Sequence, residues 1–167
     1  MTDARGLYDV DFVAWTEQQA AALRAAAHGG TNQPLDWENL AEEIESLGKS
    51  DRRELRSQIY RIIRHLAKLQ FSQATDPRGG WRESVRDGRK RADLVLADSP
   101  SLKPQLDQFV FEETPGAINR TVADLGEFGE VDAATQRALR QTQYTVDQVL
   151  GDWFPPEPSG PARAADA

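Results

Sequence analysis

The sequence contains no cysteine among its 167 residues, which excludes disulfide bonds, thiol nucleophiles, iron–sulfur clusters and cysteine-ligated zinc. It also has no apolar run near the roughly 20 residues that a membrane-spanning helix needs. The first residues show neither the apolar stretch of a secretory signal nor a lipidation motif. We therefore expect a cytoplasmic protein that does not insert into a membrane.

Valine and isoleucine are sparse, whereas alanine, leucine, glutamate, glutamine and arginine are abundant. Apolar residues recur at intervals of three and four, which is the pattern of amphipathic helices. This pattern predicts long helices over residues 11–28, 36–48, 50–69 and 81–98, and a fifth that begins at residues 99–101. Shorter helices are predicted over residues 132–140 and 145–150.

Glycine and proline set the expected helix boundaries. Gly29 and Gly30 end the first helix, and Gly48 ends the second, after which Ser50 caps the third. Pro115 is expected to break or kink the helix in which it lies, because proline lacks a backbone N–H donor.

The predicted fold class is therefore all-α. We expect an antiparallel helical bundle of four main helices plus shorter C-terminal helices. A chain of this length with 39% hydrophobic residues suits one core, so residues 7–154 are predicted to form a single domain. Residues 155–167, rich in proline and alanine, are predicted to be a disordered tail.

The net charge of −7 is unevenly distributed along the chain. Residues 1–48 hold 9 acids and 2 bases, residues 49–91 hold 5 acids and 13 bases, and residues 92–167 hold 13 acids and 5 bases. The basic middle zone is therefore expected either to pair with the acids of the same chain or to bind an anionic partner.

Within this basic zone, two stripes are the candidate binding residues for nucleic acid or an acidic protein. One stripe shares a helix face through Arg61, Arg64 and Lys68. The second comprises Arg82, Arg86, Arg89 and Lys90. Intramolecular neutralisation competes with both readings, because the other two zones together carry a charge of −15.

Other motifs give no support for catalysis or for a cofactor. Gly48-Lys49-Ser50 is similar to the end of a phosphate-binding loop, but Glu43 stands where that loop needs its first glycine. Several glutamates between residues 38 and 45 suggest a metal site together with His65, but helix geometry predicts that His65 lies too far from them to share a metal ion. We predict no catalytic residues, no cofactor and no metal ligands.

Several segments resemble a known family. They include Leu7–Trp15, Leu35–Gly48, Ser99–Leu102 and Tyr144–Leu150, and the likeness spans roughly residues 7–154. The family is domain-of-unknown-function family 29, whose members are bacterial helical proteins. The resemblance implies a helical fold and brings no substrate, cofactor or catalytic residue with it.

These observations favour a non-catalytic protein that acts by binding another protein, as a regulator or adaptor. The alternative is nucleic-acid binding through the basic helices of residues 49–91, and a third possibility is an enzyme with an unrecognised site.

Overall fold

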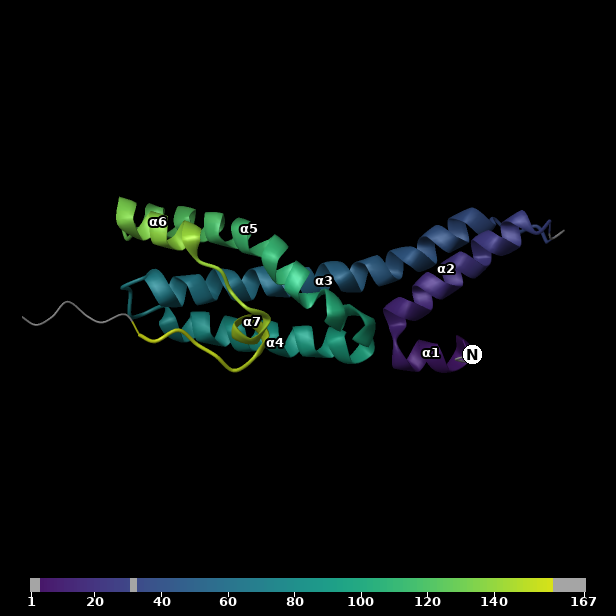
Figure 1. The fold of residues 1–167 in the computed structure, drawn as a ribbon, viewed down its shortest axis with the longest axis horizontal. Coiled ribbons are helices and arrows are strands. Elements are labelled where there is room, and N and C mark those ends of the chain that lie inside the picture. The colour runs from purple at the N-terminus through teal and green to yellow at the C-terminus, as the bar shows by residue number, and fades with distance from the viewer. Residues whose placement is uncertain (1–3, 31–32, 158–167) are drawn as a thin grey trace, which may run out of the picture. The chain divides into compact units, whose positions relative to one another are not determined.

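A computed structural model describes residues 4–30 and 33–157, and within these ranges the chain forms helices and no strand (Figure 1). The predicted all-α class is confirmed. The elements in chain order are α1 (Ala4–Val10), α2 (Phe12–His28), α3 (Trp37–Phe71), α4 (Arg78–Asp98), the short 3-10 helix η1 (Pro100–Gln105), α5 (Leu106–Glu127), α6 (Ala133–Gln141) and α7 (Val146–Leu150). None of these helices is both long and apolar enough to cross a membrane.

Gly48 does not end a helix, so the prediction of separate helices over residues 36–48 and 50–69 was wrong. Both belong to the single helix α3. A Cβ atom on Gly48 would collide with the hydroxyl of Thr16 on α2. Glycine at this position therefore allows α2 to lie close to α3, and it is not a helix stop.

Pro115 does not break its helix either. The predicted break is wrong, because α5 continues through this proline, whereas the alternative of a kink stays a prediction. Thr114, Ala117 and Ile118 on either side of it are buried, and the packing of this face maintains the helix although one backbone donor is missing. The fifth predicted helix differs at its start as well, since residues 100–105 form the 3-10 helix η1.

The chain divides into two compact units. Unit 1 consists of Met1–Leu55 and Ala92–Gln105, and unit 2 consists of Arg56–Arg91 and Leu106–Ala167. The prediction of one domain over residues 7–154 stays a prediction. Residues 158–167 of the predicted tail lie outside the described residues.

In unit 1, helix α2 runs antiparallel to the first part of α3. Glu17, near the start of α2, pairs with Arg52, whereas Arg24, farther along α2, pairs with the earlier residue Glu45. The core of this unit contains mainly small and aliphatic side chains, namely Val13, Ala20, Ala41, Leu55, Ala92, Leu96 and Leu102.

In unit 2, the rest of α3 packs antiparallel to α4 and parallel to α5. Gly88 of α4 lies against Ile62, while Gly116 of α5 lies against Tyr60. Sequential helices thus alternate in direction, as in an up-down-up bundle. The core is built mainly on α3 and α5, with Ile59, Ile62, Ile63, Leu66, Leu69, Val85, Phe109, Val110, Ile118, Leu125, Leu139 and Val149.

The close contact of Gly88 leads to a testable expectation. A Cβ atom there would lie 2.8 Å from Cγ1 of Ile62, nearer than ordinary packing allows. We expect Gly88→Ala to lower the free energy of unfolding by about 1 kcal/mol, because overpacking exceeds the gain in helix propensity. Urea unfolding measures this change. On the same helix, Gly80→Ala is the control, since nothing lies within 4 Å of its Cβ position and alanine there should stabilise. Equal stabilisation by both alanines would contradict the overpacking at Gly88.

Candidate functional site

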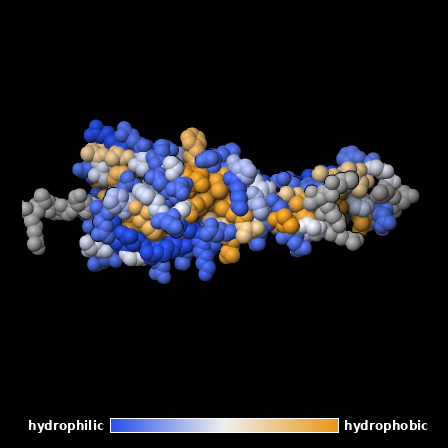
Figure 2. Space-filling view, turned by 60° about the horizontal axis from the view of Figure 1, so that its bottom comes forward, coloured by the Kyte–Doolittle hydropathy of each residue, from blue (hydrophilic) through white to orange (hydrophobic). Residues whose placement is uncertain are grey.

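The whole net charge of the protein belongs to unit 1. This unit contains thirteen acidic and six basic residues, whereas unit 2 contains fourteen of each. Most of the basic zone lies in unit 2, together with acids from later in the chain. Figure 2 shows hydrophobic side chains, in orange, at the surface beside strongly hydrophilic ones in blue.

Asp124 of α5 forms ion pairs with two basic side chains of α3, Arg64 and Lys68. Its Oδ2 atom accepts from Nε and Nη2 of Arg64 at 2.9 and 2.6 Å, and lies 2.6 Å from Nζ of Lys68. Its Oδ1 atom lies 2.9 Å from Nε of Arg120. Burial opposes ionisation of Asp124, but the hydrogen bonds from Lys68 and Arg64 outweigh it and lower its pKa. Two of the candidate cations, Arg64 and Lys68, are thus paired with a carboxylate of the same unit.

Arg89 of α4 has a structural role. It is buried, and it donates to the carbonyl oxygens of Val149, Gln148 and Trp153 at 2.9, 2.9 and 2.6 Å. These carbonyls lie at and just beyond the end of α7, where a cation stabilises the helix C-terminus. Burial lowers the pKa of Arg89.

The remaining candidate cations of α4 are Arg82, Arg86 and Lys90, and they differ in their contacts and exposure. Arg82 and Arg86 lie over the ring of Phe154, and Arg82 also pairs with Glu157 at 3.3 Å. Lys90 is exposed. Among the described residues no carboxylate pairs with Lys90 or Arg86, and the same holds for Arg61 of α3. Binding of nucleic acid or an acidic partner by these residues stays a prediction.

Unit 1 contains an acidic cavity with aromatic walls, of about 430 Å³. It is lined by Tyr8, Asp9, Phe12, Asp51 and Asp98. Burial raises the pKa of Asp51, as do the nearby charges of Asp98 and Glu54, whereas a hydrogen bond from Ser99 opposes the shift. Carboxylates beside aromatic rings are the groups that receive an ammonium or guanidinium. Sequence analysis missed this cavity, because its residues come from three distant segments.

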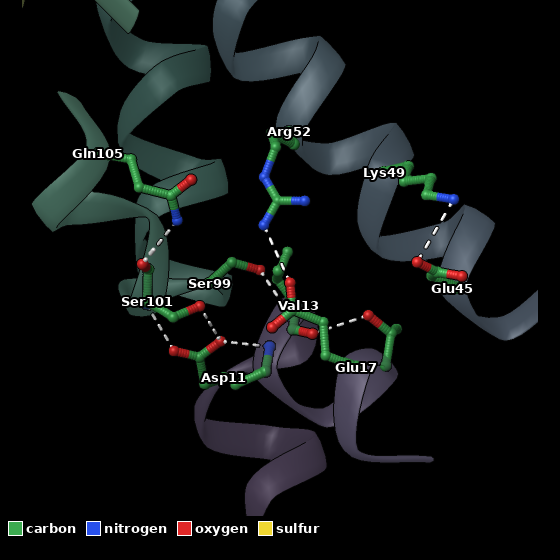
Figure 3. Close-up of polar contacts among 11 residues, drawn as sticks. Asp11, Val13, Glu17, Glu45, Lys49, Arg52, Ser99, Ser101 and Gln105 are labelled. Atoms are coloured by element: carbon green, nitrogen blue, oxygen red, sulfur yellow. Dashed lines mark hydrogen bonds and ion pairs between the residues drawn. The ribbon is translucent and has the colours of Figure 1, made fainter. Parts of the chain in front are cut away.

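Two of the segments that carry the family resemblance, Leu7–Trp15 and Ser99–Leu102, meet in unit 1. Asp11 caps α2 by accepting from the amide of Ala14 at 2.9 Å. The same carboxylate accepts from the amide and the hydroxyl of Ser101 at 2.6 and 2.8 Å (Figure 3). The hydroxyl of Ser99 accepts from the amide of Val13 at 3.2 Å. Two residues of the Ser-Pro-Ser-Leu motif thus fix the start of α2.

The described residues contain no group of three or more histidine, aspartate and glutamate side chains placed to hold a metal ion. Glu45, one of the glutamates considered with His65, binds Arg24 at 2.7 Å and belongs to unit 1. His65 belongs to unit 2.

The lowered pKa of His65 predicts that the stability of the protein depends on pH. Burial, and then the charges of Lys68, Arg64 and Arg61, lower its pKa from 6.5 to about 4. As the pH falls, the unfolded chain therefore protonates His65 before the folded protein does. The contribution of neutral His65 to the free energy of unfolding is complete above pH 6.5 and is lost as the pH falls toward 4. We expect a loss of about 2 kcal/mol over this window, reduced from the full shift because the side chain is partly exposed.

Urea unfolding between pH 4 and 7 measures this effect in the parent protein and in His65→Gln. As the pH falls from 7 to 4, the parent should lose stability relative to His65→Gln, because only the parent has this imidazole. His28→Gln, at an exposed histidine, is the control for loss of a histidine as such. A pH-independent difference would show that His65 takes up its proton equally in both states.

Three comparisons place the chain among known proteins. Residues 7–154 match the family model described as Domain of unknown function DUF29, which confirms the resemblance. A solved alpha-helical protein of unknown function from Rhodospirillum rubrum is 25% identical and has a TM-score of 0.61. The match covers 89% of this chain and 98% of that one. No curated protein matches the chain significantly.

Proposed function

The chain belongs to the family of the domain of unknown function DUF29, and on that premise we propose that it works by binding another protein through unit 1. The partner presents a basic amphipathic helix. The observation that carries this proposal is the coincidence of a net charge of −7 with exposed leucines in the same unit. A surface of this kind complements leucine and lysine on one helix.

The apolar part of this surface lies on α3. Leu40 and Leu47 are 41% and 51% exposed, and they flank the partly buried Ile44 at the spacing of one helix face. Asp51, one turn after Leu47, is a wall of the acidic cavity. A helix that covers the leucines would thus reach the cavity with its next cationic side chain.

Other apolar side chains in unit 1 are exposed as well. Among its described residues they include Tyr8, Val10, Leu35 and Leu94. Tyr8 is part of an aromatic cluster, with ring centroids 4.9 Å from Trp15 and 5.9 Å from Phe12. An aromatic cluster beside carboxylates favours arginine or lysine as the group that the partner inserts.

Fluorescence anisotropy with a labelled synthetic helix of leucine and lysine tests the proposal. We expect binding that weakens as salt is added, and at least tenfold weaker binding of a peptide in which glutamate replaces lysine. The double variant Leu40→Gln/Leu47→Gln should weaken binding about tenfold, because two apolar contacts are lost. Phe111→Gln is the matched control, since Phe111 is 70% exposed but belongs to unit 2.

Equal binding of the two peptides, or equal loss with the control variant, would contradict the proposal. Duplex DNA in the same assay addresses the alternative. Salt-sensitive DNA binding that disappears in Arg86→Glu/Lys90→Glu would favour the nucleic-acid function instead.

A further inference from the structure

Unit 2 contains a second cavity, of about 420 Å³, and none of its lining residues belongs to the binding surface proposed for unit 1. Its walls are largely apolar and come from Ala74, Pro77, Trp81, Leu125 and Phe128. A volume of this size lies within the range of small-molecule sites, which is roughly 300–1,000 Å³. The indole of Trp81 and the phenyl ring of Phe128 offer flat surfaces for an apolar ligand body.

The local chain positions these walls. Gly129 has a φ of 68°, and the amide of Glu130 donates to the carbonyl of Leu125 at 3.1 Å. This left-handed turn ends α5 and leaves Phe128 with 77% of its surface exposed at the cavity. Trp81 of α4 is only partly buried and lines the cavity.

One wall of the cavity carries a cation, Lys68. Lys68 lies in this wall with 11% of its side chain exposed, and its Nζ atom is 5.8 Å from the ring centre of Trp81. Asp124 is already shared by Lys68, Arg64 and Arg120. Glu130, the other carboxylate of the lining, accepts a hydrogen bond from the hydroxyl of Ser72. The lining thus contains one cation and two carboxylates, and both carboxylates already have partners, since Arg64 and Arg120 share Asp124 from outside the lining.

Lys68 retains donor capacity for a ligand. An ammonium group has three N–H donors, and Asp124 is the one acceptor found for Lys68 among the described residues. A negatively charged ligand group would accept a hydrogen bond from these donors and pair with the ammonium charge.

We propose that this cavity binds a small organic acid, with its carboxylate at Lys68 and its aromatic or aliphatic body between Trp81 and Phe128. The body is held by apolar burial and the carboxylate by a charge-assisted hydrogen bond. The site lies wholly in unit 2, so this inference does not rest on protein binding by unit 1.

Three probes with the same phenyl body and different charge test the proposal on the full chain. They are phenylbutyrate, the neutral phenylbutanamide and the cationic phenylbutylamine, titrated while the tryptophan fluorescence is followed. Octanoate and octanamide provide an aliphatic pair, followed by calorimetry. We expect each acid to bind about tenfold or more tightly than its amide, and the amine to bind weakest, because only the acid forms the charged pair with Lys68.

Two substitutions locate the binding. Phe128→Ala removes an exposed wall and should weaken phenylbutyrate binding about tenfold, whereas Phe111→Ala, equally exposed and outside the cavity, should leave it unchanged. Lys68→Met should abolish the preference for acid over amide while Arg64 and Arg120 still neutralise Asp124. Because Phe128 is on the surface, its variant keeps the test valid if Lys68→Met does not fold.

The proposal is overturned if neither acid binds at millimolar concentration, or if the amine binds more tightly than phenylbutyrate. It is also overturned if Phe111→Ala weakens binding as much as Phe128→Ala. None of these outcomes affects the peptide assay for unit 1, so the two proposals fail separately.

Discussion

Replacement of Asp124 by asparagine is expected to lower the free energy of unfolding by about 3 kcal/mol. Asparagine keeps the shape but removes the charge that Lys68, Arg64 and Arg120 share. The side chains of Asp124 and Lys68 are only 9% and 11% exposed, so water cannot replace the lost carboxylate well. A buried cation left without its partner is what makes such a substitution costly.

The matched control is Glu112→Gln, in the same helix. Glu112 pairs with Arg56 at 3.0 Å, but both side chains are more than one-third exposed. We expect a loss below about 1 kcal/mol for this variant, because exposed ion pairs contribute little. Urea unfolding at neutral pH compares the two. Similar losses for Asp124→Asn and Glu112→Gln would refute the central role of Asp124.

Acid provides a second test of the same carboxylate. The pKa of Asp124 is lowered in the folded protein, so its contribution is present at neutral pH and is lost as the pH falls through the folded value. The stability difference between the parent and Asp124→Asn should therefore shrink in acid. A difference that stays constant would mean that burial cancels the effect of the cations on ionisation.

Asp11→Ala is expected to lower the free energy of unfolding by about 3 kcal/mol as well. The carboxylate both caps α2 and accepts two hydrogen bonds from Ser101, and it is only 8% exposed. Loss of an N-cap costs about 1 kcal/mol, and loss of charge-assisted hydrogen bonds in a buried place adds roughly 2 kcal/mol.

A second N-cap aspartate gives the control for this variant. Asp132 caps α6 by accepting from the amide of Thr135 at 2.7 Å, in an exposed position. We expect Asp132→Ala to cost about 1 kcal/mol. Thermal unfolding of both alanine variants measures these losses. Equal losses of stability would indicate that the hydrogen bonds from Ser101 contribute nothing beyond the N-cap.

Local signals in the sequence were sufficient for several helix ends. The helices predicted over residues 11–28, 132–140 and 145–150 begin at the N-caps Asp11, Asp132 and Thr145, and the first of them ends at Gly29 as predicted. These signals work because each cap involves hydrogen bonds within a few residues of the chain. The helix α1 was not predicted, and the periodic pattern was read only from Asp11 onward.

Gly48 and Pro115 show where local signals fail. Both residues interrupt helices when neighbouring segments do not pack on them, yet both lie inside long helices here. Contact with Thr16 explains the glycine, and buried neighbours on α5 hold the proline segment. Tertiary packing outweighs a propensity cost of about 1 kcal/mol for glycine and about 3 kcal/mol for proline.

The basic zone shows the same limit for the candidate sites. Its composition and helical spacing were visible in the sequence, but the partners of Arg64 and Arg89 lie some sixty residues farther along the chain. No local pattern connects a cation with a carboxylate or carbonyl at that separation. The acidic cavity of unit 1 was missed for the same reason, since its walls come from α1, α2, α3 and α4.

The sequence by itself determined the all-α class, the family and several helix ends, because hydrophobic period, helix-end signals and family motifs are properties of neighbouring residues. The tertiary structure alone decided which cations are paired within unit 2, which leucines of unit 1 stay exposed, and where the two cavities lie. These features depend on side chains that meet across helices, and their contact energies appear only once those helices have packed.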